Sequence, residues 1–147
     1  MALMYAVPPG TILLCDYAKG GFQPPEMVKL RPAVVVSPRL PHRDGLCSVV
    51  PLSGSTDERR QLDYVVRLDL SVALPHPFPE KVFWAKCDLV ATVGFERLNM
   101  FRTDRDHTGK RRYLQPRLSA EDLGRVRAGV LYGLGLGALT KLADLSK

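Results

Sequence analysis

Four polar residues stand where predicted strands begin or end, namely Arg31, Ser53, Lys86 and Asp88. A carboxylate can accept the proton of an attacking hydroxyl, while cations and a hydroxyl can stabilise the charge on a crowded phosphorus. When the ribose of RNA supplies its own nucleophile, this chemistry requires no metal ion or cofactor. The four residue types therefore suit cleavage of an RNA phosphodiester, provided that their side chains face one cleft.

Three of these residues also have an ordinary structural explanation. Lys86 and Asp88 are two residues apart, so a regular strand would place both on one face and turn Cys87 into the core. An exposed ion pair of this kind usually contributes little. Pro32 biases Arg31 toward an extended backbone at the mouth of a strand, where a solvated charge would be unremarkable.

The elements that would position these residues are short strands followed by one helix. Pro38 ends a β-branched run that predicts a strand buried on both faces. Ser119 is expected to cap a helix whose apolar residues recur as far as Leu134, and Thr108 with Gly109 marks a hairpin tip. The predicted strands cover residues 11–17, 33–36, 46–52, 63–68 and 81–88. This order predicts a mainly β fold, a small bent antiparallel sheet or partial barrel with a C-terminal α-helix.

Length and charge limit the classes of protein to consider. A chain of 147 residues is expected to form a single domain over residues 1–147. Lysine and arginine number 21 against 15 acidic residues, a net charge of +6 that favours nucleic acid or another polyanionic partner. No apolar run is long enough to span a bilayer and no targeting segment is recognised, so we expect a cytoplasmic protein with no membrane contact.

Several other residues could suggest function but have simpler interpretations. The cysteines at 15, 47 and 87 are odd in number and far apart, so they predict core residues rather than disulfides or a zinc site. A catalytic pair among the histidines at 42, 76 and 107 is conceivable, although nothing in the sequence brings them together. The glycines at 133, 135 and 137 indicate the fraying end of the helix rather than a phosphate-binding loop. Trp84, Phe22 and Tyr113 could stack on unpaired bases, but Trp84 is predicted to lie in the core.

An ordered set of motifs resembles the MazF/PemK/Kid toxins of bacterial toxin–antitoxin systems. These are Gly10 before the first strand, Asp16 at its end, Arg31-Pro32, the segment 49–53, the segment 86–88 and the Ser119 helix. The resemblance covers about residues 9–134 and leaves 135–147 as a tail. It implies the Src-homology-3-like partial barrel of the CcdB/PemK/MazF type. It also implies a homodimeric, metal-independent endoribonuclease that cuts single-stranded RNA and is inhibited by a cognate acidic antitoxin.

The resemblance also assigns roles to individual residues. Arg31 and Ser53 match the catalytic arginine and the catalytic Thr or Ser, and Asp88 matches a proposed general base. Lys86 stands where related toxins have an arginine proposed as general acid. A free lysine has a pKa near 10.4, so we predict that Lys86 chiefly stabilises phosphate charge.

RNA contacts are expected from two sets of residues. Gln23 and Glu26 lie where the family has a Gly-x-Glu-Gln loop, which prolines interrupt in this chain. The basic residues expected to contact RNA are Lys29, Arg59, Arg60 and Arg111. The alternative function is a binding module on the same fold that engages nucleic acid, or gyrase as the related CcdB toxins do, without cutting.

Overall fold

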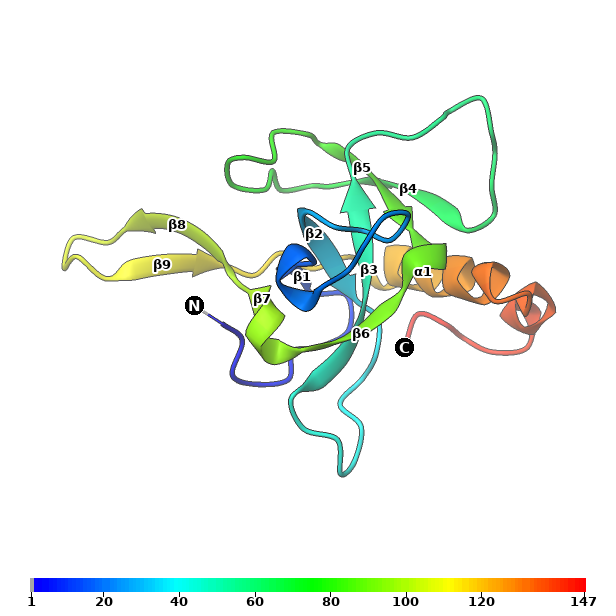
Figure 1. Cartoon of the computed structure of the whole chain (residues 1–147), viewed down its shortest axis with the longest axis horizontal. Helices are drawn as coiled ribbons and strands as arrows, with labels where there is room; N and C mark the ends of the chain where they lie inside the picture. Colours follow the sequence, from blue (N-terminus) through cyan, green and yellow to red (C-terminus); the bar gives the residue numbers. More distant parts are fainter. Residues whose placement is uncertain (1) are drawn as a thin grey trace.

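The computed structural model describes residues 2–147 and consists mainly of antiparallel strands (Figure 1). Six strands form one continuous path in the order β4-β5-β3-β2-β1-β7, and β6 pairs with β3 beside that path. Their bounds are β1 Ile12–Asp16, β2 Leu30–Val35, β3 Leu46–Ser53, β4 Val65–Asp69, β5 Val82–Lys86, β6 Ala91–Gly94 and β7 Leu98–Asn99. The predicted mainly β fold with a C-terminal helix is confirmed, and β6 and β7 are strands that the sequence did not predict.

The strand β3 is the hub of this sheet because it pairs with three others. Its first half pairs with β6, its last two residues pair with β5, and its other edge pairs with β2. A strand that exchanges one neighbour for another along its length must bend, so the sheet curls around two cores. The end of β3 therefore lies between β2 and β5.

Both faces of the central strands are buried. Val34 and Val50 belong to a first core cluster, whereas Ala33, Val35 and Val49 belong to a second cluster on the opposite face. The residues of β2 from Ala33 to Val35 are at most 1% exposed, which confirms the prediction of a strand buried on both sides.

The helix α1, Ala120–Gly133, covers the first cluster through Val126 and Val130. The Ser119 hydroxyl accepts a hydrogen bond from the amide of Asp122 at 3.1 Å, as the predicted cap requires. The helix ends at Gly133, and Gly135, with φ 76°, lets the amide of Leu136 donate to the carbonyl of Leu131. The glycine-rich end is thus an ordered cap and not a frayed one.

The remaining elements are short. The strands β8, Phe101–Arg105, and β9, Arg111–Leu114, form the hairpin whose tip was predicted at Thr108 and Gly109, and this hairpin extends away from the sheet (Figure 1). Four 3-10 turns complete the described elements: η1 Ala18–Gly20, η2 Cys87–Leu89, η3 Phe95–Arg97 and η4 Gly137–Lys141. After η4 the chain returns along α1, where Arg127 donates to the carbonyl of Leu145 at 3.1 Å. Within residues 2–147, no helix has the length and apolar character needed to cross a membrane.

Candidate active site

Arg31 lies inside β2 and not at its mouth, where the sequence placed it. The strand begins at Leu30, and Arg31 pairs with Cys15 of β1. Its Nε atom is buried and has no hydrogen-bond partner among the described residues. A buried donor of this kind is uncommon in folded proteins, so Arg31 retains hydrogen-bonding capacity for a bound group.

Ser53 is the last residue of β3 and lies across the sheet from Arg31. The β2–β3 register pairs Ala33 with Pro51, so continuing it by two residues brings Arg31 opposite Ser53 on the same face. The Ser53 hydroxyl donates to the carbonyl of Ser55 at 2.9 Å and accepts from the Ser55 amide at 3.3 Å. Ser53 is only 8% exposed, so its hydroxyl is held in a turn at the strand end.

Lys86 ends β5 on the same face of the sheet. Ser53 pairs with Trp84, and Lys86 follows two residues later, so the three side chains lie on one side. Its ammonium group donates to the hydroxyl of Thr56 at 2.8 Å. Partial burial lowers the pKa of Lys86, and the nearby charge of Asp88 raises it by a smaller amount.

Asp88 lies in the turn η2 and not on a strand. The expectation that Lys86 and Asp88 share one face of a regular strand is therefore wrong. β5 ends at Lys86, where the backbone turns into η2 and exposes Asp88 while Cys87 enters the first core cluster. The end of α1 packs directly on this turn: a Cβ atom at Gly133 would lie 3.2 Å from Cα of Asp88. The helix, rather than strand alternation, therefore positions the carboxylate.

Arg31, Ser53 and Lys86 lie on one face at one end of the sheet, and Asp88 follows Lys86 in the turn η2. Arg31, Ser53 and Lys86 come from three neighbouring strands, and the carboxylate of Asp88 is near enough to influence the Lys86 ammonium. A carboxylate near an ammonium group can accept a proton, while the ammonium group favours a phosphate close by. The arrangement can accommodate phosphodiester chemistry, and the individual catalytic roles remain predictions.

The segment that leads into β2 carries three of the residues expected to contact RNA. Gln23, Glu26 and Lys29 are exposed, and the amide of Gln23 donates to the Glu26 carboxylate at 3.3 Å. Phe22 does not project freely, because its ring packs edge-on against Tyr17 and lies 4.6 Å from the Arg97 guanidinium. Phe22 is therefore an anchor of this segment and not an available stacking surface.

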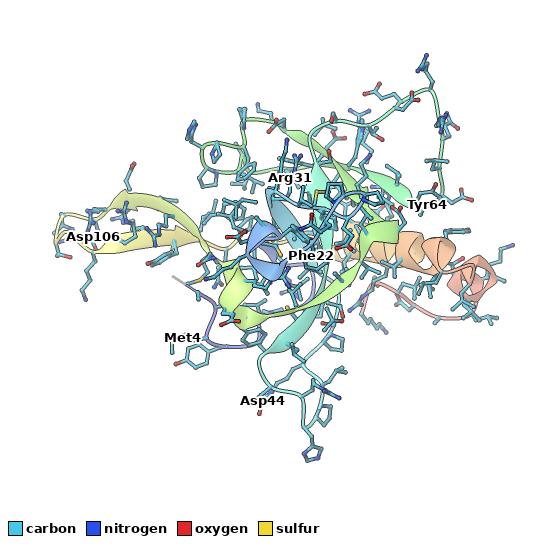
Figure 2. The ribbon with its side chains drawn as sticks, viewed as in Figure 1. Met4, Phe22, Arg31, Asp44, Tyr64 and Asp106 are labelled. Atoms are coloured by element: carbon cyan, nitrogen blue, oxygen red, sulfur yellow. The ribbon has the colours of Figure 1, made fainter. Side chains whose placement is uncertain are left out.

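The other expected RNA contacts lie in two separate regions. Arg59 and Arg60 are exposed in the β3–β4 loop, where both pair with Asp57, at 3.1 and 3.6 Å. Arg111 belongs to the β8–β9 hairpin. Figure 2 shows Arg31 in the middle of the molecule and Asp106, at the hairpin tip, far to one side. The hairpin and the candidate active site are thus distant from each other.

Sequence reasoning misplaced Trp84 and missed its surroundings. Trp84 is half-buried and not in the core, because it lies on the same side of β5 as Lys86. The guanidinium of Arg67, its partner on β4, lies 5.7 Å from the Trp84 ring. The core residues Phe83 and Ala85 of β5, followed by Cys87 of η2, alternate along the chain, and this was the signal that could have placed Trp84 outward.

The histidines and cysteines contribute nothing to this site. The three histidines are exposed and lie in three different connections, between β2 and β3, between β4 and β5, and at the β8–β9 tip. Cys15 and Cys87 are buried as predicted, Cys47 is half-buried, and all three are free thiols. The described part of the chain has no group of three or more His, Cys, Asp or Glu side chains able to hold a metal ion.

Comparison with solved structures identifies relatives of the fold. The chain superposes on the Mycobacterium tuberculosis toxin MazF-mt6 with a TM-score of 0.53 and 16% identity, covering 86% of this chain and 97% of that one. It also matches an endoribonuclease in complex with its cognate antitoxin from a mycobacterial species, with a TM-score of 0.55 and 17% identity over 90% and 97% of the two chains. At such identities the likeness shows a shared fold.

Comparison of sequences identifies the family. The chain is 32% identical to the putative uncharacterized protein YifN of Escherichia coli strain K12, in an alignment that covers 73% of this chain and 81% of YifN. Residues 9–130 match the family described as the PemK-like, MazF-like toxin of type II toxin-antitoxin system, a span that includes all four residues of the candidate active site. The chain therefore belongs to the PemK-like, MazF-like toxins of type II toxin–antitoxin systems.

Proposed function

We propose that this protein is an endoribonuclease that cleaves single-stranded RNA without a metal ion and thereby inhibits translation. The observation that carries the proposal is the row formed by Arg31 and Ser53 across β2 and β3, with Lys86 and Asp88 beside it. The unpartnered Nε of Arg31 supports an anion site here, because a phosphate oxygen would accept the hydrogen bond that no described residue accepts. Family membership supports the same conclusion.

The proposed reaction is an internal attack by the ribose. Asp88 takes the proton of the 2′-hydroxyl, the 2′ oxygen bonds to phosphorus, and the bond from phosphorus to the 5′ oxygen breaks. The products are a 2′,3′-cyclic phosphate and a 5′-hydroxyl end, the latter after the leaving oxygen gains a proton. Arg31 and Lys86 stabilise the charge of the pentacovalent phosphorus, with Ser53 as a further hydrogen-bond donor.

The burial of Lys86 adds to its proposed role. An ammonium group with a lowered pKa is a better proton donor than a free lysine or an arginine, so Lys86 is also suited to protonate the leaving oxygen. Its bond to Thr56 holds the ammonium group toward the β3–β4 loop. Stabilisation of phosphate charge remains the main role that we assign to Lys86.

The direct test is an RNA cleavage assay with the purified protein. Single-stranded RNA of mixed sequence is incubated with the protein in the presence of EDTA, and the fragment ends are analysed by mass spectrometry. Discrete fragments that end in a 2′,3′-cyclic phosphate are expected. RNA that stays intact, while its electrophoretic mobility is shifted by the protein, would instead support a binding module.

The binding module is the second candidate function. The burial and hydrogen bonding of Ser53 favour it. Its hydroxyl is occupied by Ser55 and only 8% of the residue is exposed, so substrate contact requires the turn after β3 to rearrange. A protein that only binds nucleic acid, or gyrase as CcdB toxins do, has no need of an available hydroxyl there. The cleavage assay separates the two candidates.

A toxin of this kind requires an inhibitor and is proposed to act as a homodimer. The net charge of +6 favours an antitoxin with an acidic, flexible segment that folds onto the basic surface. One structural relative is itself described as an endoribonuclease in complex with its cognate antitoxin. We place the protein in the cytoplasm, where the RNA substrate is found. Size-exclusion chromatography with light scattering tests the dimer.

A further inference from the structure

A groove of about 730 Å³ lies between the β3–β4 loop, the strands β4 and β5, and the helix α1. We propose that this groove receives one unpaired nucleobase of the RNA, next to the phosphate that is cleaved. This inference rests on the proposed ribonuclease function and adds to it a site that would determine base preference. None of Arg31, Ser53, Lys86 and Asp88 lines the groove, so it is distinct from the candidate active site.

The aromatic lining is the first reason for this assignment. Trp84 forms part of the floor, with the Arg67 guanidinium 5.7 Å from its ring, and Tyr132 of α1 lines the groove and is 41% exposed. Exposed aromatic rings on a rigid frame are what proteins use to bind unpaired bases, because every base has a face that can stack. Tyr132 lies beyond residue 130, where the match to the family ends.

The charged and polar lining is the second reason. Arg60, Arg67 and Arg125 bring positive charge that a sugar–phosphate backbone requires, while Gln61 and Asp63 offer groups that can bond to a base edge. Each arginine also pairs with an aspartate, at 3.6, 3.4 and 3.0 Å respectively. The pairs of Arg60 and Arg67 are exposed and that of Arg125 is partly buried; such pairs contribute little energy, so the arginines can turn toward phosphate.

The third reason is the connection between the groove and the candidate active site. Thr56 lines the groove and accepts the hydrogen bond from Lys86 at 2.8 Å. Trp84 lies between them as well, since it precedes Lys86 by two residues on the same side of β5 and pairs with Ser53. A base in the groove would therefore belong to a nucleotide directly adjacent to the scissile phosphate.

Trp84 provides the experimental signal, because it is the single tryptophan of the chain. Its fluorescence is followed while a single-stranded RNA of mixed sequence with 2′-O-methyl groups, which cannot be cleaved, is added. Saturable quenching, with protection of Trp84 from acrylamide, is expected. RNA binding that leaves the fluorescence and its acrylamide quenching unchanged would overturn the assignment.

Variants give a second, independent readout. Trp84→Leu removes the stacking surface, and we expect KM for a short RNA to rise about 5- to 150-fold while kcat changes little. Trp84→Phe should keep most of the affinity, and Gln61→Ala, in an exposed loop, should alter the base preference without affecting folding. Tyr5→Leu is the matched control, since Tyr5 is 78% exposed and lines a different hollow.

The outcomes distinguish the two proposals. Wild-type protein that cleaves RNA, together with Trp84→Leu and Gln61→Ala variants of unchanged KM and base preference, would refute the groove and leave the ribonuclease intact. Wild-type protein that neither binds nor cleaves RNA would refute both. If an acidic peptide quenches Trp84 and RNA does not, the groove is a protein-binding site and the nucleobase assignment is wrong.

Discussion

Gly129 of α1 lies so close to Cys87 of η2 that a Cβ atom on the glycine would be 2.6 Å from the cysteine sulfur. One helical turn later, Gly133 approaches Asp88 in the same way. The two glycines share a helix face, so α1 rests directly on the turn that carries the proposed general base. Glycines that reduce the helix propensity of this segment thus allow the helix to position Asp88.

Replacing Gly129 by alanine should therefore destabilise the protein. Alanine improves helix propensity by about 1 kcal/mol, but overpacking against Cys87 costs about 1–3 kcal/mol and should outweigh the gain. Urea unfolding followed by circular dichroism measures the difference. Gly124→Ala is the matched control: its Cβ would lie no closer than 3.4 Å to a neighbouring atom, so this variant should be at least as stable as the wild type. Equal stabilities of the two variants would contradict the close packing.

Replacing Arg31 by alanine should abolish RNA cleavage while leaving the fold intact. A single donor to a developing negative charge is commonly worth about 10²–10³ in rate, and Arg31 is the proposed donor at the phosphorus. Initial cleavage rates are measured beside melting temperatures. Arg43→Ala, an exposed arginine in the β2–β3 connection, is the control that should cleave normally. A fully active Arg31→Ala variant would remove Arg31 from the mechanism.

Replacing Lys86 by methionine should slow cleavage and change how stability depends on pH. Because burial lowers the pKa of Lys86, the folded protein binds this proton less tightly than the unfolded chain. The lysine therefore favours folding more as pH rises through the lowered pKa toward about 10.4, its value in the unfolded chain. The stability of the wild type relative to Lys86→Met should increase between neutral and alkaline pH in chemical denaturation. A constant difference would show that Lys86 is not desolvated.

Replacing Arg97 by lysine should loosen the segment between β1 and β2. The Arg97 guanidinium lies 4.6 Å from the Phe22 ring, donates to the carbonyl of Asp16 at 3.4 Å, and occupies the space where a Cβ of Gly20 would stand. A lysine cannot reproduce this planar contact, so we expect a loss of about 1 kcal/mol. Faster hydrogen exchange at residues 18–28 and a higher KM for RNA should result. Arg102→Lys, an exposed change on β8, should alter neither.

The thiols of Cys15 and Cys87 should react slowly in the native protein. Burial raises the pKa of Cys15 to about 11 and that of Cys87 to about 12, and both side chains are fully buried. Since the thiolate is the reactive form, a thiol reagent at pH 8 should modify them only after denaturant is added. Rapid modification of both cysteines without denaturant would contradict the packing of both clusters.

The sequence determined the elements whose signals are local. Pro38 and the β-branched run before it sufficed for β2, and the Ser119 cap sufficed for α1, because propensity and capping act within a few residues. The Arg31-Pro32 motif, the segment 49–53 and the Lys86-Cys87-Asp88 motif likewise indicated the family and the four candidate residues. Short strands without a strong pattern, such as β6 and β7, were missed because pairing with distant strands creates them.

Only the tertiary structure decided how these residues are arranged. The register of β2, β3 and β5 brings Arg31, Ser53 and Trp84 into one row, and no local signal encodes register between distant strands. The turn η2 replaces the expected end of β5, and α1 packs against this turn through Gly129 and Gly133. Trp84 is likewise partly exposed because the first core cluster covers the opposite face of β5, the face of Phe83 and Ala85. Long-range packing, which a single sequence does not display, therefore set the geometry of the site.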